Sequence, residues 1–422
     1  MASITGLLLI ACKGVPHDRP VPTTEASTPT EASIPTEASI PIEASIPIEA
    51  STPAPPPTIS SAAPDHPDAS ALDCRVLRGP VELPIRAPSA LAIHGDMLEA
   101  VLNDNGHPRF VSLPAAPVTP GAVPPVRERS DGDNTAGFSI PCAVAADRVF
   151  CPDRSGAVHR STRGGEEDHV AASSRVASHI AAATVGGAHV ALAYLASRQT
   201  SEGWVSEAWL AVDDDPPVRV SEDGSGATAI ALAQRSGAVL ALMIDARTAL
   251  TAMHARTIDY TNSLRLGEDF VVFVGGPGDR RTRAALSVPK VGAAWSFLPI
   301  ARDVGTFGLA IVRIDEPPRV DEPVVWSMYP NGLDPAPVAA ASGGSGGSVT
   351  WVARVRPQAV EPSSPRVLEL GQIALGSAFA TRGVLPTTGT PTDVAVAVDS
   401  FGALWVAWVD GGGSWLERLL CR

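Results

Sequence analysis

From about residue 90 onward, short apolar runs alternate with turn residues, and helical periodicity is scarce. In the clearest example, the apolar run 394–398 is followed by Asp399-Ser400-Phe401-Gly402 and then by a second apolar run, 404–409. Two apolar runs on either side of a short segment containing Gly and Asp are typical of a β-hairpin. We therefore expect strand, turn and strand at this point of the chain.

The same hairpin template recurs along the chain. Residues 229–245 align with 394–410 without a gap, 165 residues earlier, and residues 180–194 carry a third copy. Weaker copies begin near residues 90, 143 and 338, so most neighbouring turns lie about 40–55 residues apart. Self-similarity at this period is typical of a radial β array, in which each repeat buries its apolar face against its neighbours.

With this repeat, residues 71–422, which we call the head, resemble a β-propeller of the general sialidase or Kelch type. At about fifty residues per blade, the roughly 350 residues of the head give about seven blades, and six or eight also fit. The small residues of each first strand agree with that architecture, since the innermost strands crowd the central channel. Segment 261–329 supplies one or two blades. Two packed β-sandwiches are the alternative, although their copies would not keep one register over the whole head.

The segment before the head contains a proline-rich hexapeptide repeat. From Glu25 to Pro53 the chain repeats Glu-Ala-Ser-(Thr/Ile)-Pro-(Thr/Ile), with one proline in every copy. Each proline removes a backbone donor and disfavours helix at the preceding residue. We expect residues 12–70 to form a disordered, extended linker that joins an anchor to the head at 71–422. A hexapeptide β-helix competes with this interpretation, but its only candidate for a buried apolar position is the variable Thr/Ile.

The N-terminus carries the tetrad Leu9-Ile10-Ala11-Cys12 behind a short apolar run. This tetrad resembles the lipobox of bacterial lipoproteins. The resemblance implies that residues 1–11 are a signal peptide, that Cys12 is lipidated, and that the head faces the periplasm or the cell surface. The membrane would then be a partner through the lipid at Cys12. The alternative is an ordinary cytosolic N-terminus with a chance cysteine, since no Lys or Arg precedes the apolar run.

The remaining four cysteines suit an oxidising compartment. Cys74 opens the head and Cys421 is the penultimate residue, and a closed propeller brings these ends together. Cys142 and Cys151 flank a candidate hairpin turn, where opposed positions come close enough to bridge. We therefore expect disulfides Cys74–Cys421 and Cys142–Cys151. The alternatives are free buried thiols or a metal pair, although no CxxC motif or His cluster accompanies these cysteines.

Charge and motifs narrow the function classes. The net charge of −13 disfavours a nucleic-acid partner, which calls for a basic stripe. Residues 343–347 match G-x-S-x-G formally, but lie between two β runs in place of a strand and a helix. Residues 221–225 resemble the sialidase Asp box weakly and predict a β-turn. We read the Asp-rich segments 131–134 and 213–215 as solvated loops, and the Arg cluster 280–283 as a hairpin tip.

These observations assign no catalytic residue, cofactor or metal site to the sequence. The function that they favour is a cell-envelope lipoprotein that displays a propeller as a non-catalytic binding or scaffold module for a protein or a glycan. The alternative is a propeller hydrolase or lyase acting on a glycan, which would need two carboxylates at one cleft. The two classes differ in whether carboxylates converge at the binding site of the folded head, as the enzyme alternative requires.

Overall fold

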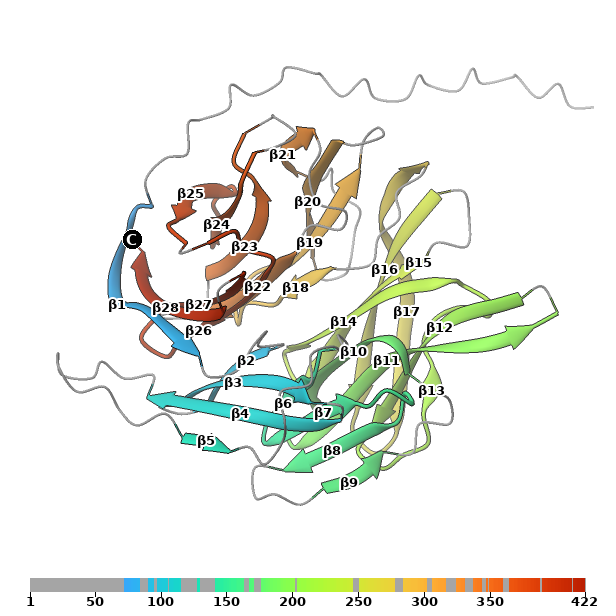
Figure 1. The fold of residues 1–422 in the computed structure, drawn as a ribbon. Helices are drawn as coiled ribbons and strands as arrows, with labels where there is room; N and C mark the ends of the chain where they lie inside the picture. The colour runs from blue at the N-terminus through green and yellow to red at the C-terminus, as the bar shows by residue number, and fades with distance from the viewer. Residues whose placement is uncertain are drawn as a thin grey trace, which may run out of the picture. The chain divides into compact units, whose positions relative to one another are not determined.

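In the computed structural model, the head is a seven-bladed β-propeller. Within the described residues, the strands form seven four-stranded antiparallel sheets, and the chain has no other class of regular element (Figure 1). The structure describes residues 72–83, 90–94, 97–104, 106–114, 127–129, 141–162, 167–170, 176–201, 203–245, 250–277, 284–301, 306–315, 324–330, 337–343, 347, 349–359, 364–387, 389–411 and 413–421. The expected signal peptide, Cys12 and linker therefore lie outside the described residues.

Each sheet is one blade, and its strands follow one another in the chain from the innermost to the outermost. Blades 1 to 4 consist of β2 (Ala90–His94), β3 (Met97–Asp104), β4 (His107–Pro114) and β5 (Arg127–Arg129); β6 (Ala143–Ala145), β7 (Arg148–Pro152), β8 (Val158–Thr162) and β9 (Glu167–Val170); β10 (Val176–Val185), β11 (His189–Thr200), β12 (Gly203–Val212) and β13 (Val218–Arg219); and β14 (Ala227–Arg235), β15 (Ala238–Asp245), β16 (Leu250–Tyr260) and β17 (Leu264–Pro277).

The other three blades repeat this order, except that the last one takes its outermost strand from the start of the head. Blades 5 to 7 consist of β18 (Ala285–Ser287), β19 (Ala294–Ala301), β20 (Thr306–Ile314) and β21 (Val324–Pro330); β22 (Val338–Gly343), β23 (Val349–Pro357), β24 (Arg366–Ala374) and β25 (Ala380–Leu385); and β26 (Asp393–Val398), β27 (Leu404–Asp410), β28 (Gly413–Cys421) and β1 (Cys74–Leu83).

The innermost strands contact one another around the full circle, and this closes the ring. Contacts join β2 to β6, β6 to β10, β10 to β14, β14 to β18, β18 to β22, β22 to β26, and β26 back to β2. Small side chains permit this approach. At Gly343 in β22, an added Cβ would lie 2.6 Å from Cβ of Val398 in the neighbouring β26. The first glycine of the G-x-S-x-G match therefore has a packing role.

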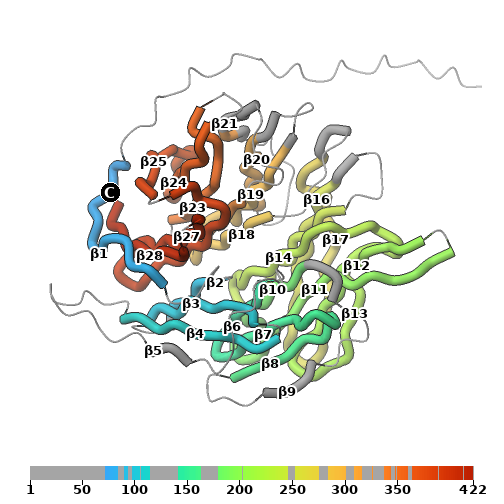
Figure 2. Tube along the Cα trace, in the orientation of Figure 1, coloured from blue at the N-terminus to red at the C-terminus, as the bar shows by residue number. Residues whose placement is uncertain are grey.

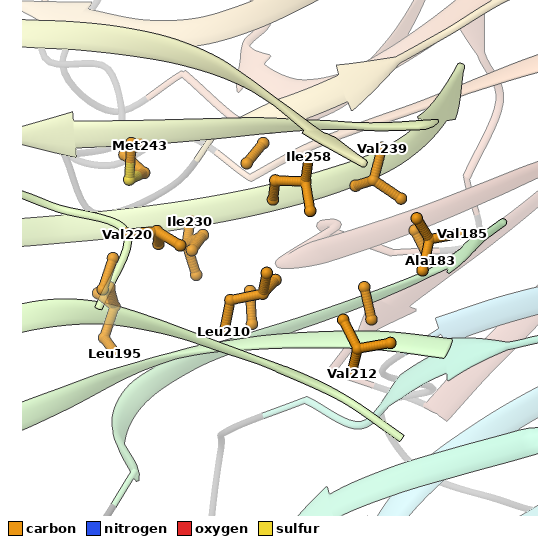
Figure 3. Close-up of a cluster of buried hydrophobic side chains, with 14 of the residues drawn as sticks. Ala183, Val185, Leu195, Leu210, Val212, Val220, Ile230, Val239, Met243 and Ile258 are labelled. Carbon is orange, nitrogen blue, oxygen red and sulfur yellow. The ribbon is translucent and has the colours of Figure 1, made fainter. Parts of the chain in front are cut away.

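The core is divided among the seven interfaces between neighbouring blades, each with its own cluster of buried apolar side chains. Figure 3 shows the cluster between blades 3 and 4, where Leu210 and Val212 of β12 face Ile230 of β14 and Ile258 of β16. Burying one such Leu or Ile side chain contributes about 1.5–3 kcal/mol relative to leaving it exposed. The expected single propeller is confirmed, and its stability depends on the interfaces between blades.

The hairpins read from the sequence are present. The template at 394–410 forms β26 and β27, and the one at 229–245 forms β14 and β15. In the latter, Ser236 and Gly237 form the two-residue turn with φ of 47° and 88°. Positive φ at both positions suits the twist of a tight hairpin. Segment 261–329, from which the sequence predicted one or two blades, contains the last strand of blade 4 and the four strands of blade 5.

The propeller closes through its two ends. Strand β1 pairs antiparallel with β28, with Arg75 opposite Leu420 and Cys74 opposite Cys421. Figure 2 shows the first strand running beside the end of the chain. The two facing cysteines form a disulfide, with their Cα atoms 4.1 Å apart. The first and last strands of the head thus complete blade 7 together.

Candidate functional site

A pocket of about 450 Å³ lies between blades 5 and 6. It opens on the face of the propeller that carries the β18–β19 and β24–β25 connections, which we call face 1. Its described lining comprises Pro289, Val291, Gly292, Ala293, Trp295, Arg313, Ile373, Ala374, Leu375, Gly376, Ser377 and Ala378. This volume lies within the range of small-molecule sites, about 300–1,000 Å³.

One wall of the pocket combines an aromatic ring with a guanidinium. Trp295 of β19 lies opposite Arg313 of β20, so both side chains stand on the same face of blade 5. That face is the one toward blade 6, because Trp295 packs against the cluster that includes Ile373 of β24. Arg313 donates from Nε to a carboxylate oxygen of Asp315 at 2.9 Å. This ion pair orients the guanidinium beside the ring and leaves it other donors for a ligand.

The mouth of the pocket is apolar, and the loop on one side of it lies close to the turn on the other. Val291 and Leu375 are 53% and 56% exposed, which is high for large aliphatic side chains. Gly292, with φ of +100°, brings the loop so close that an added Cβ would lie 2.9 Å from Cδ1 of Leu375. Any larger residue at position 292 would be strained and would press on that rim.

The loop on the blade 5 side is held in place by blade 6. The backbone N–H of Lys290 donates to the carbonyl of Gly347 at 2.8 Å, and the Lys290 side chain packs on that glycine. On the other side, Ser377 N–H donates to the carbonyl of Ala374 at 3.0 Å and so forms the β24–β25 turn. The pocket is therefore largely preformed.

Sequence reasoning missed this site. Trp295 and Arg313 lie in segment 261–329, where the sequence leaves the number of blades open, and the first strand of that blade, β18, has only three residues. A usable signal was nevertheless present, since Val291-Gly292 places an apolar residue and a glycine in a turn beside a tryptophan. Only the three-dimensional pairing of blades 5 and 6 shows that the β24–β25 turn completes the pocket.

Both expected disulfides are present, and neither lines the pocket. Cys142–Cys151 joins the start of β6 to the facing position of β7, with the Cα atoms 4.4 Å apart. Cys74–Cys421 lies where β1 pairs with β28 in blade 7, and we call this pairing of the two ends of the head the seam. Disulfides of this kind are typical of proteins outside the reducing cytoplasm. The lipidation expected at Cys12 lies outside the described residues.

The other candidates from the sequence have structural roles or lie outside the described residues. Within 221–225, Ser225 N–H donates to the carbonyl of Glu222 at 3.3 Å, in agreement with the expected turn between blades. The segments 131–134 and 280–283 and residues 344–346 lie outside the described residues. In the part of the chain that the structure describes, no three acidic, His or Cys side chains could hold a metal ion. There is also no helix long and apolar enough to cross a membrane in that part.

The expectation of a solvated loop at 213–215 is wrong for Asp213. Its carboxylate accepts from Arg148 of blade 2 at 2.6 Å and lies 2.6 Å from Nδ1 of His189. Burial alone would raise the pKa of Asp213, but the hydrogen bonds from His189, the Val190 backbone and Arg148 lower it overall. The sequence showed an acidic run and could not show the basic partners on other strands. Asp213 joins blade 2 to blade 3, and both of its carboxylate oxygens take part in hydrogen bonds.

Comparisons with known proteins concern the fold alone. No protein-family model matches the chain, and no curated protein matches it in sequence. Among solved structures, it is similar to a streptogramin B lyase (11% identity, TM-score 0.48, covering 82% of this chain and 97% of that one). It is also similar to the BP39L lectin from Burkholderia pseudomallei (18%, 0.46, 78% and 96%) and to Trypanosoma rangeli sialidase (9%, 0.40, 78% and 54%). Identities and TM-scores this low leave function to be argued from the site.

Proposed function

We propose that the protein is a lipid-anchored protein of the bacterial cell envelope whose propeller binds a glycan in the pocket between blades 5 and 6. The observation that carries this proposal is the pairing of Trp295 with Arg313 in a pocket lined otherwise by small and aliphatic residues. A sugar ring has an apolar C–H face, which packs on an aromatic ring, and hydroxyl groups, which accept from a guanidinium. The pocket offers both kinds of contact side by side.

The lining favours binding over hydrolysis. Among the described lining residues, Arg313 is the ionisable side chain, and its carboxylate partner Asp315 stands outside the lining. Hydrolysis of a glycosidic bond uses two carboxyl groups about 5–10 Å apart on either side of the bond. A pocket of this composition supports recognition of an uncharged ligand. The described lining of this pocket therefore lacks the pair of carboxyl groups that the hydrolase alternative requires.

The anchor is the second part of the proposal and rests on the sequence. Cys12 would carry the lipid, and the proline-rich linker 12–70 would hold the propeller away from the membrane. The two disulfides in the head agree with a location outside the cytoplasm.

The test is glycan binding by the head and by two tryptophan variants. The head should bind a defined oligosaccharide on a glycan array and in titration calorimetry, and Trp295→Ala should weaken binding about 30-fold, a loss of ~2 kcal/mol. Trp204 is the matched control, because it is 72% exposed near the turn between β11 and β12 and lies outside the pocket lining. Trp204→Ala should bind normally. Equal affinity of both variants, or the absence of any glycan ligand, would refute the proposed site.

A further inference from the structure

A second, much smaller cleft lies between blades 3 and 4. It is built from the β13–β14 connection and from β15, β16 and β17 of blade 4. Because strands within a blade are antiparallel, connections between blades lie on the face opposite the β18–β19 and β24–β25 connections. We call this opposite side face 2. The cleft shares no lining residue with the pocket between blades 5 and 6.

Two buried polar atoms in this cleft have no partner. Ser225 is 2% exposed, and its hydroxyl makes no hydrogen bond with any described residue. Oδ1 of Asp269 is likewise buried without a hydrogen-bond partner there. Buried polar atoms are nearly always satisfied, so two unsatisfied atoms lining one cleft indicate that a ligand satisfies them.

The charge of the cleft is negative. Glu222, Asp245 and Asp269 line it together with His254, whose Nδ1 lies 3.1 Å from Oδ2 of Asp269. Arg256 lies 3.7 Å from the same oxygen and donates to the backbone carbonyl of Val220. The Asp269 hydrogen bond raises the pKa of His254; burial opposes this, and the charges of Asp269, Asp245 and Glu222 raise it further. The cleft thus favours positive charge.

The loop that carries Ser225 is held rigidly. The backbone N–H of Gly224 donates to Oε1 of Glu207 at 3.1 Å, and Ser221 Oγ accepts from the backbone N–H of Ala208 at 3.0 Å. Glu207 is fully buried and is itself paired with Arg198 at 2.9 Å. The Ser225 hydroxyl is therefore fixed before any ligand arrives, which lowers the entropy cost of binding.

We propose that the cleft on face 2 binds the ammonium group of a primary amine. Its cavity of about 10 Å³ admits one water-sized group, which matches an ammonium head and excludes a trimethylated one. An –NH₃⁺ group has three donors and no acceptor. It would donate to Asp269 Oδ1, to Ser225 Oγ and to the carboxylate of Glu222 or Asp245. The aliphatic stem would leave the cleft beside Glu222, which is the exposed residue of the lining.

The experiment titrates the full chain with n-butylammonium at neutral pH and measures binding by calorimetry. Wild type should bind it, and Asp269→Asn should bind at least about tenfold more weakly, because a charge-assisted hydrogen bond is lost. Ser225→Ala should weaken binding by a smaller factor. Asp214→Asn is the matched control, since it removes one carboxylate charge at a side chain 82% exposed outside the cleft, and it should bind normally.

A second measurement uses the wild-type protein and therefore does not depend on whether a variant folds. Because the bound cation would lie beside His254, saturation with n-butylammonium should lower the pKa of that imidazole in an NMR titration of wild type. An unchanged His254 titration would overturn the proposal. So would tetramethylammonium binding as tightly as n-butylammonium, or a loss in Asp214→Asn equal to that in Asp269→Asn.

The source of the amine is distinguished by comparing two further probes. Tighter binding of Nα-acetyl-lysine amide than of n-butylammonium would assign a lysine side chain of a partner protein. Equal binding of the two would assign a free aliphatic amine. Failure of both probes would overturn the amine site and leave the glycan pocket untouched, because the two sites share no residues.

Discussion

The two disulfides close chain loops of very different length, and this allows a test of what holds the ring together. The Cys74–Cys421 bridge spans a sequence separation of 347 residues, and the Cys142–Cys151 bridge spans nine. In the chain-entropy model, a crosslink destabilises the unfolded state by a constant plus an amount that grows with the logarithm of the loop length. The seam bridge then contributes about 6 kcal/mol at 25 °C, and the hairpin bridge about 3 kcal/mol.

The perturbation is to replace each pair by alanine in separate double variants. For a head of this size, the entropy of unfolding converts these losses into drops of about 8 °C and 4 °C in Tm, respectively. Packing works against this order, because Cys151 is fully buried and Cys142 nearly so, whereas Cys74 and Cys421 are partly exposed. A larger loss at the seam would therefore be due to loop closure.

The assay is unfolding by guanidinium, monitored by the fluorescence of the buried Trp405 and Trp408. Thermal unfolding is the second measurement. Free thiols should be counted first, so that each variant is known to retain the other bridge. If the Cys142/Cys151 variant loses as much stability as the Cys74/Cys421 variant, the loop-closure reasoning is wrong. Unfolding of the Cys74/Cys421 variant in two separate steps would show that blade 7 opens before the rest of the ring.

Four further outcomes can be checked. Burial raises the pKa of Glu417 to about 6, so the fold binds a proton more tightly than the unfolded chain and loses stability as the pH rises through about 4.5–6. Glu417→Gln should therefore be more stable than wild type by up to about 2 kcal/mol at pH 8 and equal to it at pH 4, as measured by denaturant unfolding at each pH; an equal difference at both values would contradict this. Cys12→Ala should move the protein from the membrane to the soluble fraction, and identical fractionation of the two forms would exclude the anchor. Limited proteolysis should leave a stable fragment that begins near Ala71, and a resistant N-terminal fragment would count against the linker. Gly292→Val should abolish glycan binding in calorimetry while the far-UV circular dichroism stays that of wild type, because the new side chain presses on Leu375; retained binding would place the ligand elsewhere.

The hairpins and the seam could be predicted from the sequence because their signals are local or topological. Alternating Ala and Val in 394–398 and a Gly-containing turn fix the inner hairpin of blade 7 without any reference to its neighbours. The bridge between Cys74 and Cys421 follows from closure, since a ring must bring its two ends together. Neither inference needs knowledge of how one blade packs on the next.

The binding sites could not be predicted, because each is formed by an interface between blades. Trp295 and Leu375 are separated by 80 residues in the chain and meet only when blades 5 and 6 pack together. Ser225 and Asp269 likewise come from the connection after blade 3 and the last strand of blade 4. Strand β17 adds to the difficulty, since its pairing with β16 contains three register shifts that break the alternation of apolar and polar positions.

The shared blade also determines when the head can fold. Strand β1 is the first part of the head to be synthesised and β28 the last, yet they are hydrogen-bonded partners in one sheet. Until β28 has left the ribosome, blade 7 lacks the strand that joins β27 to β1, and the interface of blade 7 with blade 1 lacks Leu416. The ring therefore cannot close before β28 has been synthesised. The Cys74–Cys421 disulfide has the same requirement, because its two cysteines face each other only once β28 has paired with β1, and it therefore locks a ring that has already closed.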